Sequence, residues 1–285
     1  MTVRILTDST SYIDNDLRKE LDIRRVSLNI SFGEQSMREI DVTNEDFYQM
    51  MEKEGIPSSS QPSIGEFYQE MEKVVSQGDP LCGIFLSSDM SGTYSTALLA
   101  KEMVMEKYPE AQIEIIDARS NSMQLGFAAL QGARAAQAQK ALAEVKEIVL
   151  ENIKRSRFLF IPDNLDYLKK GGRIGGASAL IGNLFKIIPI LTVEEGKVVV
   201  LTKVRHKEKA ILAMINKMLE DISKYGLGEI AVHHINCLDE AQALVKKIKE
   251  KVATQVKVIP IGPVIGLHVG PGAIGIVYYT EKDMR

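Results

Sequence analysis

The sequence predicts an α/β protein made of two packed α/β domains, with a cleft between them. First, strand-like runs alternate with helical patterns in the first half, which favours a mainly parallel sheet covered by helices on both faces. Second, a predicted hairpin and a series of short strands in the second half indicate a mixed or antiparallel sheet. Third, 285 residues are enough for two domains, which we place at 1–155 and 156–285.

The first half contains strands and helices in near alternation. The predicted strands are 3–7, 25–32, 81–87 and 113–117, and the predicted helices are 44–54, 64–77, 93–108, 122–139 and 142–153. Val26, Leu28 and Ile30 alternate as the residues of a strand do. Asn44, followed by two acidic residues, is typical of a helix N-terminus.

The second half has a different pattern. Residues 189–193 and 198–204 flank Glu195-Gly196, which predicts a hairpin. Further strands are predicted at 158–161, 229–235, 256–261 and 274–279, and helices at 180–187, 207–224 and 239–252. No flexible linker or repeat separates the halves, so we expect firmly packed domains with a cleft between them.

Composition excludes several classes of protein. The net charge of −3, with 45% hydrophobic and 26% charged residues, does not suggest a nucleic-acid or anionic-membrane partner. We see no signal-peptide pattern, and the most apolar stretch, 177–191, is interrupted by polar residues and a proline. Cys82 and Cys237 are far apart, lack metal-ligand spacing and are expected to be reduced thiols in the cytoplasm.

The turn after the strand at 81–87 is rich in hydroxyl groups. Ser91, Gly92 and Thr93 open the next helix, where unpaired backbone N–H groups and the helix dipole favour an anion. The simpler alternative is that Ser91 only caps its own helix. A catalytic serine is a weaker alternative, because the nucleophile elbow needs glycine where Asp89 and Thr93 stand. A second polar loop, 57–63, precedes the helix that leads into this strand.

Two glycine-rich stretches invite nucleotide-binding interpretations. Residues 270–275 match G-x-G-x-x-G, but a strand follows where the dinucleotide motif needs a helix, so we expect a glycine turn between two strands. A nicotinamide-dependent oxidoreductase is therefore only a rival hypothesis. Residues 168–176 have the composition of a phosphate loop but lack the lysine-serine or lysine-threonine ending of a P-loop. A sugar- or nucleotide-binding protein with two domains is a further alternative.

His268 is the histidine most suited to a site. It lies in the segment 262–272, whose glycines and prolines should form a rigid loop, although a structural role is equally plausible from the residue alone. His233 and His234 are neighbours on a predicted strand and must point to opposite faces. Asp8 ends the first strand and is expected to cap the segment that follows.

Several of these motifs together resemble the DegV family of bacterial fatty-acid-binding proteins. The resemblance rests on Leu6-Thr7-Asp8-Ser9-Thr10, on Ser59-Ser60-Gln61-Pro62-Ser63, on Ser91-Gly92-Thr93-Tyr94, on Asp117-Ala118-Arg119-Ser120, on 168–176 and on 262–273. These motifs occur in the family's order from one end of the chain to the other.

The resemblance implies a long-chain fatty acid between the two domains, with no metal and no further cofactor. It assigns the binding of the carboxylate to Ser59, Ser91 and His268. The family usually has threonine at the position of Ser59, so the hydroxyl is kept and a methyl group is lost.

The resemblance also implies a non-catalytic subunit of a fatty acid kinase, which serves phospholipid synthesis. The protein would present the fatty-acid carboxylate to an ATP-binding partner that forms the acyl-phosphate, and Arg173 would lie on the surface where that partner docks. The alternative function is a serine-dependent ester or thioester hydrolase using Ser91. Candidate tail-lining residues, which are equally plausible as ordinary core, are Met123, Leu125, Phe127, Leu184, Phe185 and Ile188.

Overall fold

The computed structural model of the chain describes residues 2–180 and 187–284. By internal contacts the chain divides into a first unit, Met1–Val42 with Ser59–Ile153, and a second unit, Thr43–Ser58 with Lys154–Arg285. The expected boundary between residues 155 and 156 lies close to the junction after Ile153. Thr43–Ser58 counts with the second unit although it comes early in the sequence.

The first unit is organised around a parallel sheet in the order β2-β1-β6-β7. Its strands are β1 (Arg4–Asp8), β2 (Ile23–Val26), β6 (Leu81–Phe85) and β7 (Ile113–Asp117). Its main helices are α1 (Asn15–Glu20), α3 (Ile64–Val75), α4 (Thr93–Lys107), α5 (Ser122–Gln137) and α6 (Leu142–Arg155), the last of which ends in the second unit.

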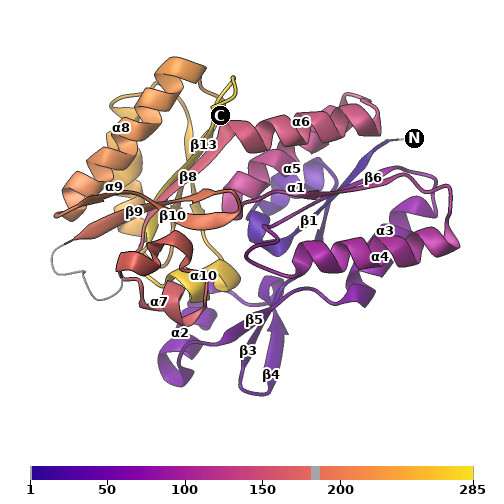
Figure 1. Ribbon diagram of the computed structural model, residues 1–285, viewed down its shortest axis with the longest axis horizontal. Helices are drawn as coiled ribbons and strands as arrows, with labels where there is room; N and C mark the ends of the chain where they lie inside the picture. The colour runs from indigo at the N-terminus through magenta and orange to yellow at the C-terminus, as the bar shows by residue number, and fades with distance from the viewer. Residues whose placement is uncertain (1, 181–186, 285) are drawn as a thin grey trace. The chain divides into compact units, whose positions relative to one another are not determined.

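Alternation along the strands distributes the helices of the first unit between the two faces of its sheet. Leu6 and Phe85 belong to a buried cluster with residues of α3 and α4. Ile5 and Ile84 point to the other face, where they approach Gly132 of α5. Figure 1 shows α3 and α4 together on one face and α5 on the other.

The second unit contains a mixed sheet in the order β10-β9-β8-β13-β11-β12, in which only β11 and β12 are parallel among the described pairs. Its strands are β8 (Ser156–Ile161), β9 (Ile188–Glu194), β10 (Lys197–Val204), β11 (Ile230–His234), β12 (Val256–Pro260) and β13 (Ile274–Tyr279). Its helices are α2 (Asn44–Glu54), α7 (Asp166–Lys170), α8 (Lys207–Tyr225), α9 (Leu238–Lys249) and α10 (Pro263–Val269). The predictions of an α/β fold, a parallel first sheet, a mixed second sheet and the β9–β10 hairpin are confirmed.

A buried carboxylate fixes α8 to the sheet of the second unit. Asp221 on α8 accepts a hydrogen bond of 2.7 Å from the Tyr278 hydroxyl of β13. It also pairs with Arg157 of β8 and with Lys217 one turn earlier, each at 3.0 Å. Burial beside this carboxylate raises the pKa of Tyr278 above its ordinary value. Two cations and a hydroxyl thus offset the cost of burying the charge.

The predicted strand 25–32 is wrong as a single element, because the chain changes sheets within it. β2 ends at Val26, and β3 (Asn29–Phe32) belongs to a small sheet with β4 (Gln35–Arg38) and β5 (Ser58–Ser60). The N–H of Ser27 donates to Glu66 Oε1 and that of Leu28 to Ser9 Oγ, both at 3.0 Å. Because side chains accept these two N–H groups, neither N–H pairs with a neighbouring strand.

The predicted loop at 262–272 is also wrong, because it contains α10. Pro263 occupies the first helical position, where its missing N–H costs nothing. The helix stops at Gly270, whose φ of 90° requires glycine. The glycine turn therefore connects a helix to β13 and not two strands. Most of the helix predicted at 180–187 lies outside the described residues.

Both cysteines are free thiols within the described residues. Cys82 is buried in β6, and Cys237 lies partly buried at the start of α9. Within residues 2–180 and 187–284, no helix is long and apolar enough to cross a membrane.

We expect Asp8→Asn to lower the free energy of unfolding by about 1–3 kcal/mol. Both carboxylate oxygens of Asp8 accept backbone N–H groups, from Thr10 at 2.9 Å and from Leu86 at 2.8 Å. The amide of asparagine has only one oxygen, so its NH₂ group must face one of these two N–H donors. Chemical denaturation of the two proteins measures the loss.

Asp14→Asn is the matched control for this substitution. Asp14 is exposed and caps α1 through one oxygen, which asparagine keeps, so its stability should change by less than about 0.5 kcal/mol. Equal losses in the two variants would contradict the bridging role of Asp8.

Candidate functional site

Buried polar side chains gather where the parallel strands of the first unit end. Asp8 is the last residue of β1, Ser87 follows β6, and Ser120 and Ser122 follow β7, and all four are buried. The carboxylate of Asp8 caps the short helix Ser9–Ser11, as predicted, and it also binds the N–H of Leu86 next to this edge. Burial raises the pKa of Asp8 to about 6, against the opposing effect of its hydrogen bonds. Parallel sheets place their ligand crevices at this edge.

Ser91 stands at the N-terminus of α4. Its N–H donates to Ser87 O at 3.1 Å, and its Oγ accepts the N–H of Thr93 at 3.3 Å. The hydroxyls of Ser91 and Thr93 are 2.9 Å apart and share a hydrogen bond. Gly92 is the N-cap residue of α4, and Ser91, one residue earlier, accepts the first N–H of the helix and presents a partly buried hydroxyl beside the first N–H groups of a helix of 15 residues.

Arg119, in the loop after β7, holds the turn that carries Ser91. Its guanidinium pairs with Asp89 at 2.6 Å and donates to the Ser88 hydroxyl at 3.3 Å. The carboxylate of Asp117 accepts the N–H of Arg119 at 2.8 Å and that of Ser88 at 3.3 Å. These bonds explain why the Asp117-Ala118-Arg119-Ser120 motif accompanies the serine turn, a connection that sequence reasoning missed.

Ser59 lies on β5, partly buried, in a segment that contacts the start of α4. The side chain of Gln61 packs so closely on Gly92 that a Cβ at residue 92 would lie 3.1 Å from it. The first unit thus brings the segment of Ser59 beside that of Ser91. Gln61 stands in the quoted serine loop, but nothing in the sequence showed that it packs on Gly92.

His268 lies in the last turn of α10 in the second unit, partly buried against Gly171. Burial, with a smaller contribution from the charge of Arg173, lowers the pKa of His268 from 6.5 to about 4. The imidazole is therefore neutral at pH 7, with one donor and one acceptor nitrogen.

Arg173 lies in the exposed basic segment that follows α7. Its guanidinium donates to Gly171 O at 2.7 Å, and Lys169 and Lys170 are exposed beside it. Gly175, in the same segment, approaches β10 so closely that a Cβ there would lie 2.3 Å from Val198 O. The segment is thus packed against β10 within the second unit. It does not have the arrangement of a P-loop.

The structure also bears on the rival interpretations. All four histidines belong to the second unit, whereas Ser91 belongs to the first. The glycine pattern at 270–275 begins at the end of a helix and runs into β13, which is the reverse of a dinucleotide motif. In the described part of the chain, no cluster of His, Cys, Asp and Glu has a metal-binding arrangement.

The structure describes four of the six candidate tail-lining residues. Met123, Leu125 and Phe127 are buried in α5. Ile188 packs at the edge of the cluster beneath α8 and α9. Leu184 and Phe185 lie outside the described residues.

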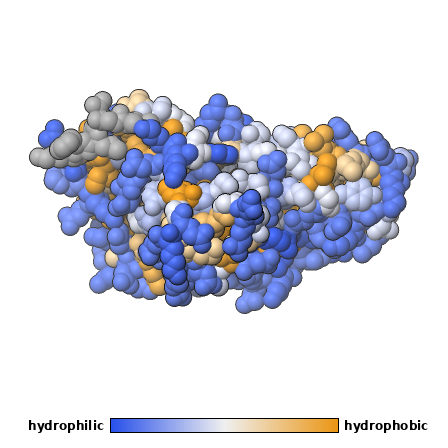
Figure 2. Space-filling view, turned by 90° about the horizontal axis from the view of Figure 1, so that it is seen from below, coloured by the Kyte–Doolittle hydropathy of each residue, from blue (hydrophilic) through white to orange (hydrophobic). Residues whose placement is uncertain are grey.

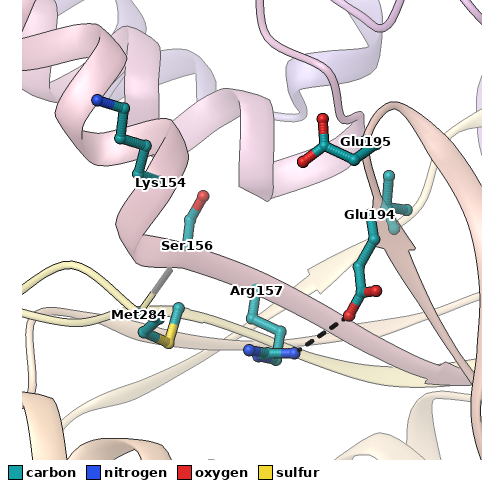
Figure 3. Close-up of a pocket in the computed structure, with 7 residues that line it drawn as sticks. Lys154, Ser156, Arg157, Glu194, Glu195 and Met284 are labelled. Atoms are coloured by element: carbon teal, nitrogen blue, oxygen red, sulfur yellow. Dashed lines mark ion pairs between the residues drawn. The ribbon is translucent and has the colours of Figure 1, made fainter.

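A cavity of about 260 Å³ in the second unit lies apart from these residues (Figure 3). Its lining is largely charged and comprises Lys154, Ser156, Arg157, Val193, Glu194, Glu195 and Met284. Arg157 and Glu194 point toward each other across it at 3.6 Å. Charged walls do not suit an alkyl chain.

A more apolar hollow of about 430 Å³ lies in the first unit, at the end of β6 opposite to Ser91. The surface seen in Figure 2 is mainly hydrophilic, and its apolar side chains form small separate groups. Neither cavity includes Ser59, Ser91, His268 or Arg173.

The chain is similar to known proteins along its whole length. A model of the DegV family, described as uncharacterised proteins, matches residues 2–281. A DegV domain-containing protein of Clostridium acetobutylicum is 62% identical over 285 residues, with 100% of both chains covered.

Two solved structures share the fold. DegV of Bacillus subtilis, described as a fatty acid binding protein, is 33% identical with a TM-score of 0.87, covering 98% of this chain and 99% of that one. A DegV family protein of Thermus thermophilus, described by its fatty acid binding, is 26% identical with a TM-score of 0.89, covering 98% and 100%. The resemblance noted in the sequence is thereby confirmed, and the chain belongs to the DegV family.

Proposed function

We propose that this protein binds one long-chain fatty acid and presents its carboxylate to the ATP-binding subunit of a fatty acid kinase. The observation that carries the proposal is the pair of hydroxyls at the N-terminus of α4, Ser91 and Thr93, in a fold whose relatives are described as fatty acid binding. In this role the chain is a cytoplasmic carrier, and acyl-phosphate formation belongs to its partner.

The start of α4 suits a carboxylate for electrostatic reasons. The dipole of a helix places partial positive charge at its N-terminus, and the first N–H groups have no partner within the helix. The Ser91 hydroxyl lies beside these groups and can turn its proton toward an anion. Ser59, on the neighbouring segment, supplies a second hydroxyl.

His268 supplies a third donor in this proposal. A neutral imidazole donates one hydrogen bond to a carboxylate without removing a proton from anything. The low pKa of about 4 keeps the ring neutral over the physiological range, so head-group binding should not depend on its titration near pH 7. In this proposal His268 acts as a binding group.

The alkyl chain supplies most of the affinity. Burial of each CH₂ contributes about 0.8 kcal/mol, so a long chain contributes on the order of 10 kcal/mol before ordering costs. Hydrogen bonds to the charged head group add roughly 1.5–3 kcal/mol each and mainly set its direction. The head group must point outward for the partner to phosphorylate it.

The protein, purified under mild conditions, should contain a fatty acid at close to one equivalent. Denaturing extraction followed by mass spectrometry measures it, and a lipid-free sample is then titrated with oleate. Protein that carries no fatty acid and binds none would overturn the proposal. Turnover of a chromogenic ester without a partner, abolished by Ser91→Ala, would replace it with the hydrolase alternative.

Ser91→Ala should weaken oleate binding about tenfold, because one hydrogen bond to a charged group is lost. Ser91→Thr keeps a hydroxyl and should retain most of the affinity. Ser95→Ala, at an exposed position in the first turn of α4, controls for a general effect on the helix. Equal affinities for Ser91→Ala and wild type, measured by calorimetry, would remove Ser91 from the site.

Arg173→Ala should lower acyl-phosphate formation by a fatty acid kinase subunit at least fivefold, roughly the effect of losing one important interface contact. Oleate affinity should stay unchanged, since Arg173 is an exposed docking residue. Lys170→Ala, also exposed and basic in this segment, is the matched control. A rate equal to that of wild type would show that the kinase docks elsewhere.

A further inference from the structure

The imidazole of His268 occupies the space that a side chain at residue 171 would fill. A Cβ built on Gly171 would lie 2.2 Å from His268 Nδ1 and 3.2 Å from Tyr167 O. The first distance is impossible for a real contact, so any residue other than glycine must displace the ring.

Space, and not backbone conformation, is what requires glycine at position 171. Gly171 has φ −75° and ψ −6°, an ordinary helical conformation open to every L-residue. The next residue differs, because Gly172 has φ +70° and nothing within 4 Å of its added Cβ. The two glycines of the Gly171-Gly172 pair therefore serve different purposes.

A second contact of the same kind joins α7 to α10. A Cβ on Gly270, which ends α10, would lie 2.3 Å from the ring of Tyr167. Each helix thus places an aromatic ring on a glycine at or just beyond the end of the other. This reciprocal contact fixes the last turn of α10, which carries His268, against α7.

Gly171 is itself held by hydrogen bonds of its own segment. Its N–H donates to Tyr167 O at 2.8 Å, which caps α7. Its carbonyl accepts the guanidinium of Arg173 at 2.7 Å. Because its own N–H bonds to Tyr167 O, Gly171 is held at the end of α7 independently of Arg173.

We propose that Gly171 is the positioning residue for His268: it aims the imidazole at the fatty-acid carboxylate by leaving room for the ring at one place only. This inference rests on the proposed function and adds to it. A neutral imidazole donates along a single N–H direction, so its value as a head-group donor depends on where the ring is held. The exposed docking segment and the head-group histidine then form one packed structure within the second unit.

The test compares Gly171→Ala with Gly176→Ala in the full-length chain. Gly176 lies in the same segment, but its added Cβ has ordinary contacts of 3.6 Å or more. Ring resonances of labelled histidine report the place of the imidazole, and the loss of a signal in His268→Gln assigns it. We expect Gly171→Ala to shift the His268 resonances and to weaken oleate binding about tenfold, as loss of one charged hydrogen bond does. Gly176→Ala should do neither.

A double-variant cycle keeps the test decisive if Gly171→Ala folds poorly. In the His268→Ala background the ring is gone, so Gly171→Ala should cause little further loss of thermal stability. An unmoved His268 signal in Gly171→Ala, or equal losses in both backgrounds, would overturn the positioning role. If instead His268→Gln binds oleate as wild type does, the head-group assignment of His268 fails, while the resonance shift still decides whether Gly171 places the ring.

Discussion

The carboxylate of Asp8 is the interaction on which the edge of the first sheet depends. It receives the N–H of Thr10 beyond β1 and the N–H of Leu86 beyond β6, so it ties together the two places where adjacent strands end. Leu86 is followed by Ser87, whose carbonyl accepts the N–H of Ser91. A buried charge is costly unless donors satisfy it, and here the donors are the backbone groups whose positions define the serine turn. The position of Ser91 therefore follows from the burial of Asp8.

In the second unit, close contacts between glycine residues and side chains of other segments fix the positions of the short helices. Gly171 and Gly270 lie where an aromatic ring from the other helix needs the room of a side chain, and Gly266 similarly faces the Tyr48 hydroxyl, 2.3 Å from an added Cβ. Helices this short gain little from their own hydrogen bonds. Their positions are set by these contacts, and not by the proline-rich loop that the sequence predicted at 262–272.

Sequence periodicity was sufficient to predict the larger helices and strands. It was not sufficient to predict the places where side chains, and not a neighbouring strand, accept the backbone N–H groups. The parallel strands and the β9–β10 hairpin follow from apolar alternation and turn residues. The break after Val26 does not, because Glu66 and Ser9, distant in sequence, take the N–H groups of Ser27 and Leu28. In the same way Ser91 could be found from its turn, whereas the contacts of Arg119 with Asp89 and Ser88, and of Gly171 with His268, join segments 30 or more residues apart. No local pattern records such contacts.

In the proposed function, the balance between tail and head group would allow the carrier to leave catalysis to a partner. If the alkyl chain supplies most of the affinity, the carboxylate needs only a few donors, and these need not surround it. Neutral donors such as hydroxyls and an uncharged imidazole orient a carboxylate while leaving it its negative charge, whereas a lysine or arginine in contact would neutralise much of it. A carboxylate that must attack a phosphoryl group gains from neutral donors, because it remains a nucleophile. The low pKa of His268 and the absence of a cation among the three proposed head-group residues, Ser59, Ser91 and His268, are both consistent with that requirement.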